Sequence, residues 1–289
     1  MFCLWVKKEK IIALIFDFDD TLIYGNMQQV LFDEYNVDAR LFWDEVENLF
    51  ITYNKNYCNL IANEMIYLSH FLTYVREGIF KGLNNKVLFE LGSKLKFFEG
   101  VIDLFKEINE MNRSLKESDT VINIYIVSSG FRQMILGSSI APYVTKVWAC
   151  EFIDTYLMPY YQNLDNKFSE NSILSSVCYF VDHTIKTRVI FELNKGSYDK
   201  INERIPKSRR EIPFKNMFYI ADGFNDIPAF EILNNNLNHY KNTLTVYYGN
   251  DENAKRLVKE RRVGDLAEAN YHKGTKLYNW IMEKIHLSI

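Results

Sequence analysis

Cysteine is scarce in this chain, and its copies stand alone. The four cysteines form no Cys-x-x-Cys pair and have no histidine at zinc-finger spacing; they are Cys3, Cys58, Cys150 and Cys178. This pattern excludes a structural zinc module. With 289 residues, of which 48% are hydrophobic, the chain is long enough to bury a substantial core without disulfide bonds. We therefore predict reduced and mostly buried thiols.

Concentrated positive charge and long apolar runs are lacking as well. The formal net charge is −3, and the densest basic cluster, at 207–210, is too short for a nucleic-acid footprint. No apolar run approaches the roughly 20 residues of a membrane span. The lysines near the N-terminus precede an apolar run over 11–16, which is shorter than a secretory signal core. We expect a cytoplasmic protein with no nucleic-acid or membrane partner.

What the sequence does contain is an apolar strand that ends on two acids. Residues 11–16 have the composition of a buried strand, and Asp17 and Asp19 follow at once, with Thr21 two residues further on. Two carboxylates at a strand end concentrate negative charge. This arrangement is typical of divalent-cation binding and of nucleophilic attack by an aspartate.

Three further apolar runs also end in small or polar residues. They cover residues 121–127, 217–221 and 243–248, and helical patterns lie between and after them at 101–111, 226–233, 253–261 and 274–285. Strands that alternate with helices predict an α/β fold, with a Rossmann-like, mostly parallel sheet covered by helices on both faces. Ligands of such sheets bind beyond the carboxyl ends of the strands. The polar residues after each run are therefore candidates for one common site.

Two segments interrupt this alternation. Residues 25–94 lack proline and space their apolar residues as helices do, which predicts a small helical cap on a core made of residues 1–24 and 95–289. Such a cap can be a lid that excludes water, a subdomain with its own core, or both. The segment 147–194 alternates apolar and polar residues over 176–181, which predicts a β-hairpin or meander inserted in the core.

Hydroxyl and glycine residues follow the run at 121–127. Ser128 ends the predicted strand and can donate a hydrogen bond to an anion. The backbone N–H groups of Ser129 and Gly130 lie where we expect the next helix to begin, which is a natural anion site. A Ser-Ser-Gly sequence is also a common turn or helix cap. Its position after a strand of the same sheet favours the anion-binding interpretation.

Two more acids follow the run at 217–221. Asp222 would face Asp17 from a nearby strand end, and Asp226 is either a second cation ligand or the N-cap of the next helix. Two unit charges about 4 Å apart repel by roughly 4 kcal/mol at an effective dielectric constant of about 20. Several clustered carboxylates therefore need a cation, or they take up protons. Mg²⁺ suits a ligand set made only of oxygens.

A lysine that could neutralise a bound anion is harder to place. Lys195 is our choice, because it follows an apolar run in the turn-like sequence Asn-Lys-Gly, while Lys200 and Lys186 compete with it. Lysines in turns are mostly solvent-exposed. The expected role of Lys195 is to neutralise the oxygens of the anion and to orient Asp17.

Taken in order, these motifs resemble those of the haloacid dehalogenase (HAD) superfamily, in its phosphoserine-phosphatase-like branch with a helical cap. The resemblance implies that Asp17 is a nucleophile that becomes phosphorylated and that Asp19 is an acid that later acts as base. It also implies that Ser128 is the anion-binding hydroxyl and Lys195 the lysine of the site. It implies further substrate contacts from Thr21, Ser129 and Gly130. The implied Mg²⁺ site consists of Asp17, Asp19 through its carbonyl, Asp222 and Asp226.

Two details refine what the resemblance implies. Phosphoserine phosphatases carry an acidic residue shortly after the first motif, whereas this chain has Tyr24, Gly25 and Asn26, so the resemblance does not extend to phosphoserine as substrate. Dehalogenases lack an acid at the position of Asp19, and P-type ATPases have threonine there. The acid at this position favours a phosphatase or a phosphotransferase.

The sequence thus predicts a Mg²⁺-dependent phosphomonoester hydrolase that works through a phosphoaspartyl intermediate on Asp17. Its expected partner is a small phosphorylated metabolite. One alternative is a phosphotransferase or mutase of the same fold. Another is a non-catalytic binding module that keeps the HAD fold, although the presence of Asp17, Asp19, Ser128 and Asp222 argues against it.

Overall fold

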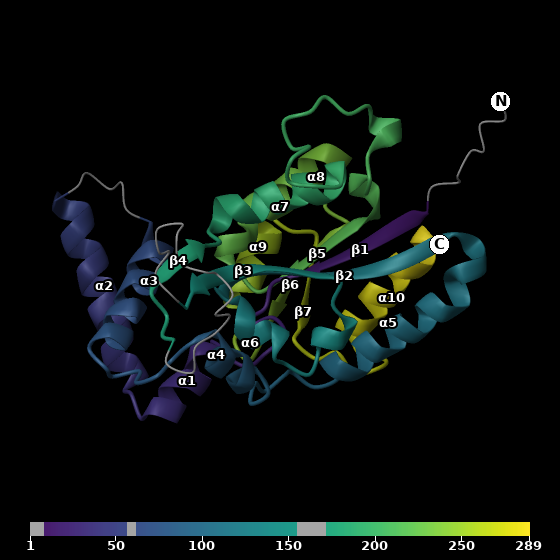
Figure 1. The fold of residues 1–289 in the computed structure, drawn as a ribbon. Helices are drawn as coiled ribbons and strands as arrows, with labels where there is room; N and C mark the ends of the chain where they lie inside the picture. The colour runs from purple at the N-terminus through teal and green to yellow at the C-terminus, as the bar shows by residue number, and fades with distance from the viewer. Residues whose placement is uncertain (1–8, 57–61, 155–171) are drawn as a thin grey trace, which may run out of the picture.

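A seven-stranded sheet with the strand order β4-β3-β2-β1-β5-β6-β7 forms the centre of the computed structural model, which describes residues 9–56, 62–154 and 172–289 (Figure 1). The strands are β1 (Lys10–Phe16), β2 (Thr120–Phe131), β3 (Lys146–Ile153), β4 (Ser176–Tyr179), β5 (Met217–Ala221), β6 (Thr243–Tyr247) and β7 (Asp265–Glu268). Neighbouring strands are parallel except for β3 and β4, which pair antiparallel. The predicted α/β fold with a mostly parallel sheet is confirmed.

The central strand is β1, as its apolar sequence requires. Residues 12–16 are fully buried, which is typical of a parallel strand with helices on both faces. Its neighbours are β2 on one side and β5 on the other. The carboxyl end of β1 therefore places Asp17 between the segments that carry Ser128 and Asp222.

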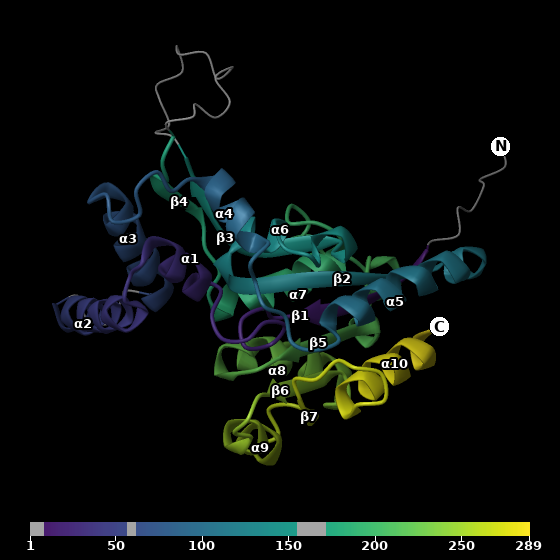
Figure 2. The ribbon, with the colours of Figure 1, turned by 90° about the horizontal axis from the view of Figure 1, so that it is seen from below.

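Helices cover both faces of the sheet. Figures 1 and 2 show α7 (His183–Lys195) and α8 (Ile227–Leu237) on one face, and α5 (Val101–Leu115) and α10 (Lys276–Ser288) on the other. Two shorter helices complete the core, α6 (Arg132–Leu136) after β2 and α9 (Glu252–Lys259) after β6. In the described part of the chain, no helix combines the length and the apolar character needed to cross a membrane.

The helical pattern of residues 25–94 corresponds to four helices in the described residues between β1 and α5. They are α1 (Gln28–Tyr35), α2 (Ala39–Asn56), α3 (Asn63–Arg76) and α4 (Asn85–Gly92), and we call them the α1–α4 unit. They gather at the end of the sheet beside β3 and β4 (Figure 2). Aromatic rings form much of their interior, with centroids 4.8–6.4 Å apart among Phe32, Phe42, Phe71 and Phe80. The assignment of this unit as a cap stays a prediction.

The segment 147–194 is more than the inserted hairpin that its alternation predicts. Its first strand, β3, is a parallel member of the main sheet, and only β4 pairs antiparallel with it. The residues from 183 onward form α7, in which Asp182 caps the first turn by accepting a hydrogen bond from Ile185 N–H at 2.6 Å. The predicted end of the inserted β segment at residue 194 is wrong, because residues 183–195 form α7.

Candidate active site

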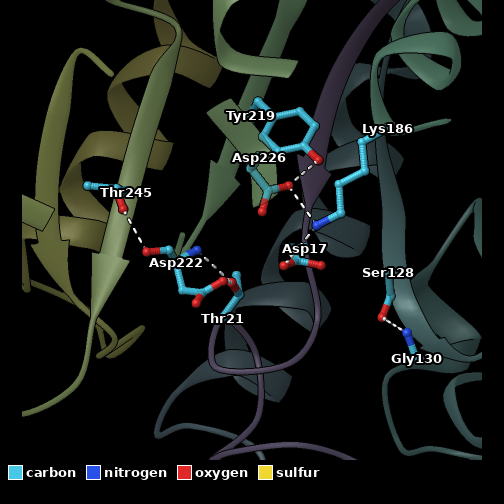
Figure 3. Close-up of polar contacts among 9 residues, drawn as sticks. All are labelled: Asp17, Thr21, Ser128, Gly130, Lys186, Tyr219, Asp222, Asp226 and Thr245. Carbon is cyan, nitrogen blue, oxygen red and sulfur yellow. Dashed lines mark hydrogen bonds and ion pairs between the residues drawn. The ribbon is translucent and has the colours of Figure 1, made fainter. Parts of the chain in front are cut away.

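Three aspartates meet at the carboxyl edge of the sheet. Asp17 directly follows β1 and Asp222 directly follows β5, and the two strand ends are linked by a hydrogen bond from Asp17 N–H to the Ile220 carbonyl at 3.0 Å. Asp226 lies four residues further, immediately before α8. Each aspartate offers a carboxylate oxygen within 4.8 Å of the other two (Figure 3). Strand ends that adjoin in a parallel sheet bring these motifs together, as the sequence predicted.

Burial makes this cluster electrostatically unfavourable without a cation. Asp17 is 7% exposed and Asp226 is 1% exposed. Burial, followed by the nearby Asp226 carboxylate, raises the pKa of Asp222 to about 7. Burial also raises the pKa of Asp226 to about 7, although Lys186 opposes the shift. The cluster therefore favours binding either protons or a cation.

Asp226 has one carboxylate oxygen that its surroundings leave free. Its Oδ2 is buried without a hydrogen-bond partner among the described residues, a state that costs free energy in a protein interior. Its side chain also makes no capping hydrogen bond to α8, although the residue occupies the N-cap position. Of the two interpretations of Asp226, the structure therefore does not support the helix cap, and the cation ligand stays a prediction.

The lysine at the site is Lys186, not Lys195. Lys186 Nζ lies 3.1 Å from Asp17 Oδ2 and 2.8 Å from Asp226 Oδ1, and the side chain is almost fully buried. Burial lowers the pKa of Lys186, but the Asp17 and Asp226 carboxylates outweigh this effect and raise it above its ordinary value. The ammonium group is therefore charged and held between two carboxylates (Figure 3).

Lys195 lies at the opposite end of α7. Its ammonium group donates to the backbone carbonyls of Ile201 and Glu203, the latter at 2.8 Å. Nine residues of α-helix separate it from Lys186, which is roughly 13 Å along the axis. The apparent Asn-Lys-Gly turn is the C-terminus of the helix, where Gly196 has a φ of 99°. Lys200 is exposed beyond that end. The Asp182 N-cap was the sequence signal that could have placed Lys186 in the first turn of α7.

Tyr219 belongs to the site although no sequence motif selects it. Its hydroxyl donates to Asp226 Oδ1 at 2.7 Å, and the residue is fully buried in β5. Lys186 contacts the same oxygen. Both donors thus occupy Oδ1, while Oδ2 has no hydrogen-bond partner among the described residues. An aromatic residue in an apolar strand resembles ordinary core, so only its tertiary contact distinguishes it.

The other two residues of the first motif have different surroundings. Asp19 Oδ1 accepts a hydrogen bond from Met27 N–H at 2.8 Å. Burial nevertheless raises the pKa of Asp19 well above its ordinary value, with a further contribution from the nearby Asp17. Thr21 is fully buried, and its hydroxyl accepts from Asp222 N–H at 3.0 Å and lies 3.4 Å from Asp222 Oδ1. Thr21 thus joins the segment after β1 to Asp222, and its predicted substrate contact stays a prediction.

The serine motif lies within an irregular strand and not at a helix start. Strand β2 continues to Phe131, and its register with β3 shifts between Val127 and Phe131. Ser128 is fully buried, and its Oγ accepts a hydrogen bond from Gly130 N–H at 2.9 Å. The Ser128 hydroxyl can still donate its own proton to another group, whereas the Gly130 N–H already donates to Ser128 Oγ. The expected helix start at Ser129 and Gly130 is wrong, because the next helix begins only at residue 132. Substrate binding by Ser129 and Gly130 stays a prediction.

Comparison with known proteins gives one close relative and several distant structures. No protein-family model matches the chain. An uncharacterised protein of Borreliella burgdorferi is 75% identical over 283 residues, which cover 98% of this chain and 99% of that protein. A relative this similar over nearly its whole length shares the family.

The similar solved structures share only the fold, because their sequence identity is low. A HAD-family hydrolase from Salmonella enterica serovar Typhi is 16% identical with a TM-score of 0.53, over 95% of this chain and 72% of that one. A phosphoserine phosphatase in a phospho-aspartyl intermediate analogue form is 16% identical with a TM-score of 0.50, over 96% and 99% of the two chains. A probable phosphoserine phosphatase from Vibrio cholerae is 15% identical with a TM-score of 0.50, over 96% and 66%. The chain therefore belongs to the family of the uncharacterised Borreliella burgdorferi protein, and its fold is that of the HAD-family hydrolases.

Proposed function

We propose that this protein is a Mg²⁺-dependent phosphomonoesterase that acts on a small phosphorylated metabolite through a phosphoaspartyl intermediate on Asp17. One observation carries the proposal. The Asp17 carboxylate is buried at a strand end, with the Lys186 ammonium 3.1 Å away on one side and the Asp222 and Asp226 carboxylates within 4.8 Å on another. A nucleophile flanked by a cation and by further carboxylates suits phosphoryl transfer, which depends on positioning and on charge compensation.

The residues present fit a Mg²⁺ ion. Asp17, Asp222 and Asp226 would hold it, since they supply only oxygen ligands and since Asp226 Oδ2 has no protein partner. When bound, the ion would offset the charge of the carboxylates and of the phosphoryl oxygens. The carbonyl of Asp19 is the fourth protein ligand in this proposal.

The chain's own groups account for both halves of the reaction. An Asp17 carboxylate oxygen attacks phosphorus, the ester P–O bond breaks, and the leaving alkoxide receives a proton from Asp19. Asp19 then takes a proton from a water molecule, which attacks the aspartyl phosphate and releases inorganic phosphate and free Asp17. The raised pKa of Asp19 supports this role, because it shifts the carboxyl group toward the protonated form that can act as an acid. Ser128 and Lys186 donate to the phosphoryl oxygens.

The fold supports the same proposal. Phosphatases are among the proteins that share it, including one captured as a phospho-aspartyl intermediate analogue. In this proposal the α1–α4 unit is the cap of a core built from residues 1–24 and 95–289. The cap would limit the access of water to the aspartyl phosphate.

An assay with p-nitrophenyl phosphate tests the proposal directly. We expect turnover with Mg²⁺ and none with EDTA. A screen of phosphorylated metabolites then identifies the substrate class. A protein that stays silent toward every compound, with and without Mg²⁺, is a binding module and contradicts the proposal. Transfer of the phosphoryl group to an added alcohol, in preference to water, identifies a phosphotransferase instead.

A further inference from the structure

The backbone around Ser128 depends on side chains from elsewhere in the fold. Because the register of β2 with β3 shifts between Val127 and Phe131, the regular ladder is interrupted where Ser128 and Ser129 lie. The Ser129 carbonyl receives two side-chain donors at this point. The Tyr67 hydroxyl lies 2.5 Å from it and the Cys150 thiol sulfur 3.2 Å from it. An irregular strand needs such partners, because its backbone polar groups are buried.

Tyr67 comes from the α1–α4 unit, not from the sheet. It lies on α3 and is 7% exposed. Its ring stacks on Phe131 with centroids 6.2 Å apart and contacts Trp43 at 5.8 Å. One turn further along α3, Phe71 packs against Phe131 at 4.8 Å. Contacts with Phe131 and Trp43 therefore fix the ring and hold the Tyr67 hydroxyl at the Ser129 carbonyl.

The α1–α4 unit also holds the segment that follows the serine motif. A methyl group added to Gly137 would lie 1.7 Å from the Phe89 carbonyl oxygen, and one added to Gly92 would lie 2.1 Å from the Met134 carbonyl oxygen. Helices α4 and α6 thus meet backbone to backbone. Residues 128–137 are consequently fixed by α3 at one end and by α4 at the other.

We infer that Tyr67 is a positioning residue for Ser128, and that through it the α1–α4 unit sets the geometry of the phosphate-binding serine. The inference rests on the proposed function, in which Ser128 donates to a phosphoryl oxygen. Without the Tyr67 hydroxyl, the weak thiol donor of Cys150 is the one side-chain partner that the Ser129 carbonyl keeps among the described residues. The backbone at Ser128 can then relax, and its Oγ moves from the position that binds the anion.

The substitution Tyr67→Phe tests the inference, because it removes the hydroxyl and keeps the packed ring. A matched control is Tyr74→Phe on the same helix, where the hydroxyl donates to Glu45 at 2.6 Å and the residue is 8% exposed. We expect Tyr67→Phe to lower kcat/KM for p-nitrophenyl phosphate roughly two- to tenfold, the range for one hydrogen bond. We expect Tyr74→Phe to leave kcat/KM unchanged. Thermal midpoints of both variants report any general loss of stability.

A double-mutant cycle with Ser128→Ala separates positioning from a merely structural role. In the Ser128→Ala background, Tyr67→Phe should cause no further loss, because the group through which it acts is gone. The same cycle is measured on the affinity for inorganic phosphate by calorimetry, which does not need turnover. Equal losses in both backgrounds, or wild-type behaviour of Tyr67→Phe, overturn the inference. If the wild type binds phosphate through Tyr67 and Ser128 but hydrolyses nothing, only the proposed function fails. If the wild type neither binds phosphate nor hydrolyses any compound, the proposed function and this inference both fail.

Discussion

The buried ammonium group of Lys186 offers the sharpest test of how the site is built. In the substitution Lys186→Met, the carboxylates of Asp17 and Asp226 lose the cation that lies 3.1 and 2.8 Å from them. Removing one partner from a buried ion pair costs about 3–5 kcal/mol, since the remaining charge is uncompensated. Loss of a preorganised donor to the reacting group lowers kcat by about 100- to 1000-fold. We expect both effects in Lys186→Met.

The stability effect should depend on pH in a defined direction. An acid whose pKa is higher in the folded chain than in the unfolded chain holds extra protons when folded, so its contribution to stability falls as pH rises. For Asp226 this window extends from the ordinary value of 3.8 to about 7. Lys186 lowers this pKa, so Asp226 should keep its proton to a higher pH in Lys186→Met than in the wild type. Urea unfolding of Mg²⁺-free Lys186→Met should therefore show a small loss of unfolding free energy near pH 5 and a loss that grows as the pH rises above about 7.

The matched control is Lys195→Met on the same helix. Its ammonium group contacts only backbone carbonyls, those of Ile201 and Glu203, among the contacts described for it, so kcat should stay within about twofold of the wild type. The argument is refuted if Lys195→Met abolishes turnover while Lys186→Met keeps it. It is also refuted if the stability loss of Lys186→Met is the same at both ends of the pH range.

Three further outcomes follow from the site and its support. Asp17→Asn should abolish turnover of p-nitrophenyl phosphate while the circular-dichroism spectrum stays unchanged; retained turnover would remove Asp17 as nucleophile. Adding Mg²⁺ should raise the thermal midpoint, and this rise should become larger from about pH 5 to about pH 8. Protons compete with the metal for Asp222 and Asp226, whose pKa values are about 7. A rise that does not depend on pH would contradict the proposed ligands. Gly137→Ala should lower the unfolding free energy by about 1–3 kcal/mol in urea titrations, because the added methyl group clashes with the Phe89 carbonyl. Gly223→Ala is the control and should leave the unfolding free energy unchanged, because its methyl group would have nothing within 4 Å.

Local patterns in the sequence predict four strands of the sheet, β1, β2, β5 and β6, and the acidic cluster. Apolar runs of strand length ending in Asp17 and Asp222 are local patterns, and parallel strands must bring their carboxyl ends to one edge. The helical character of residues 28–92 was likewise predictable, because the helical spacing of apolar residues is a local pattern. These features depend on a few neighbouring residues, and there the prediction and the structure agree.

Tertiary structure alone decided which polar side chains reach that edge. Lys186 and Lys195 lie on one helix, and only the direction of α7 across the sheet brings Lys186 to Asp17. Tyr219 and Tyr67 look like core residues in the sequence, yet their hydroxyls bond to Asp226 and to the Ser129 carbonyl. Hydrogen bonds and ion pairs are short-ranged, so a shift of one helical turn makes or removes them. Such contacts join segments far apart in the chain, which no local pattern records.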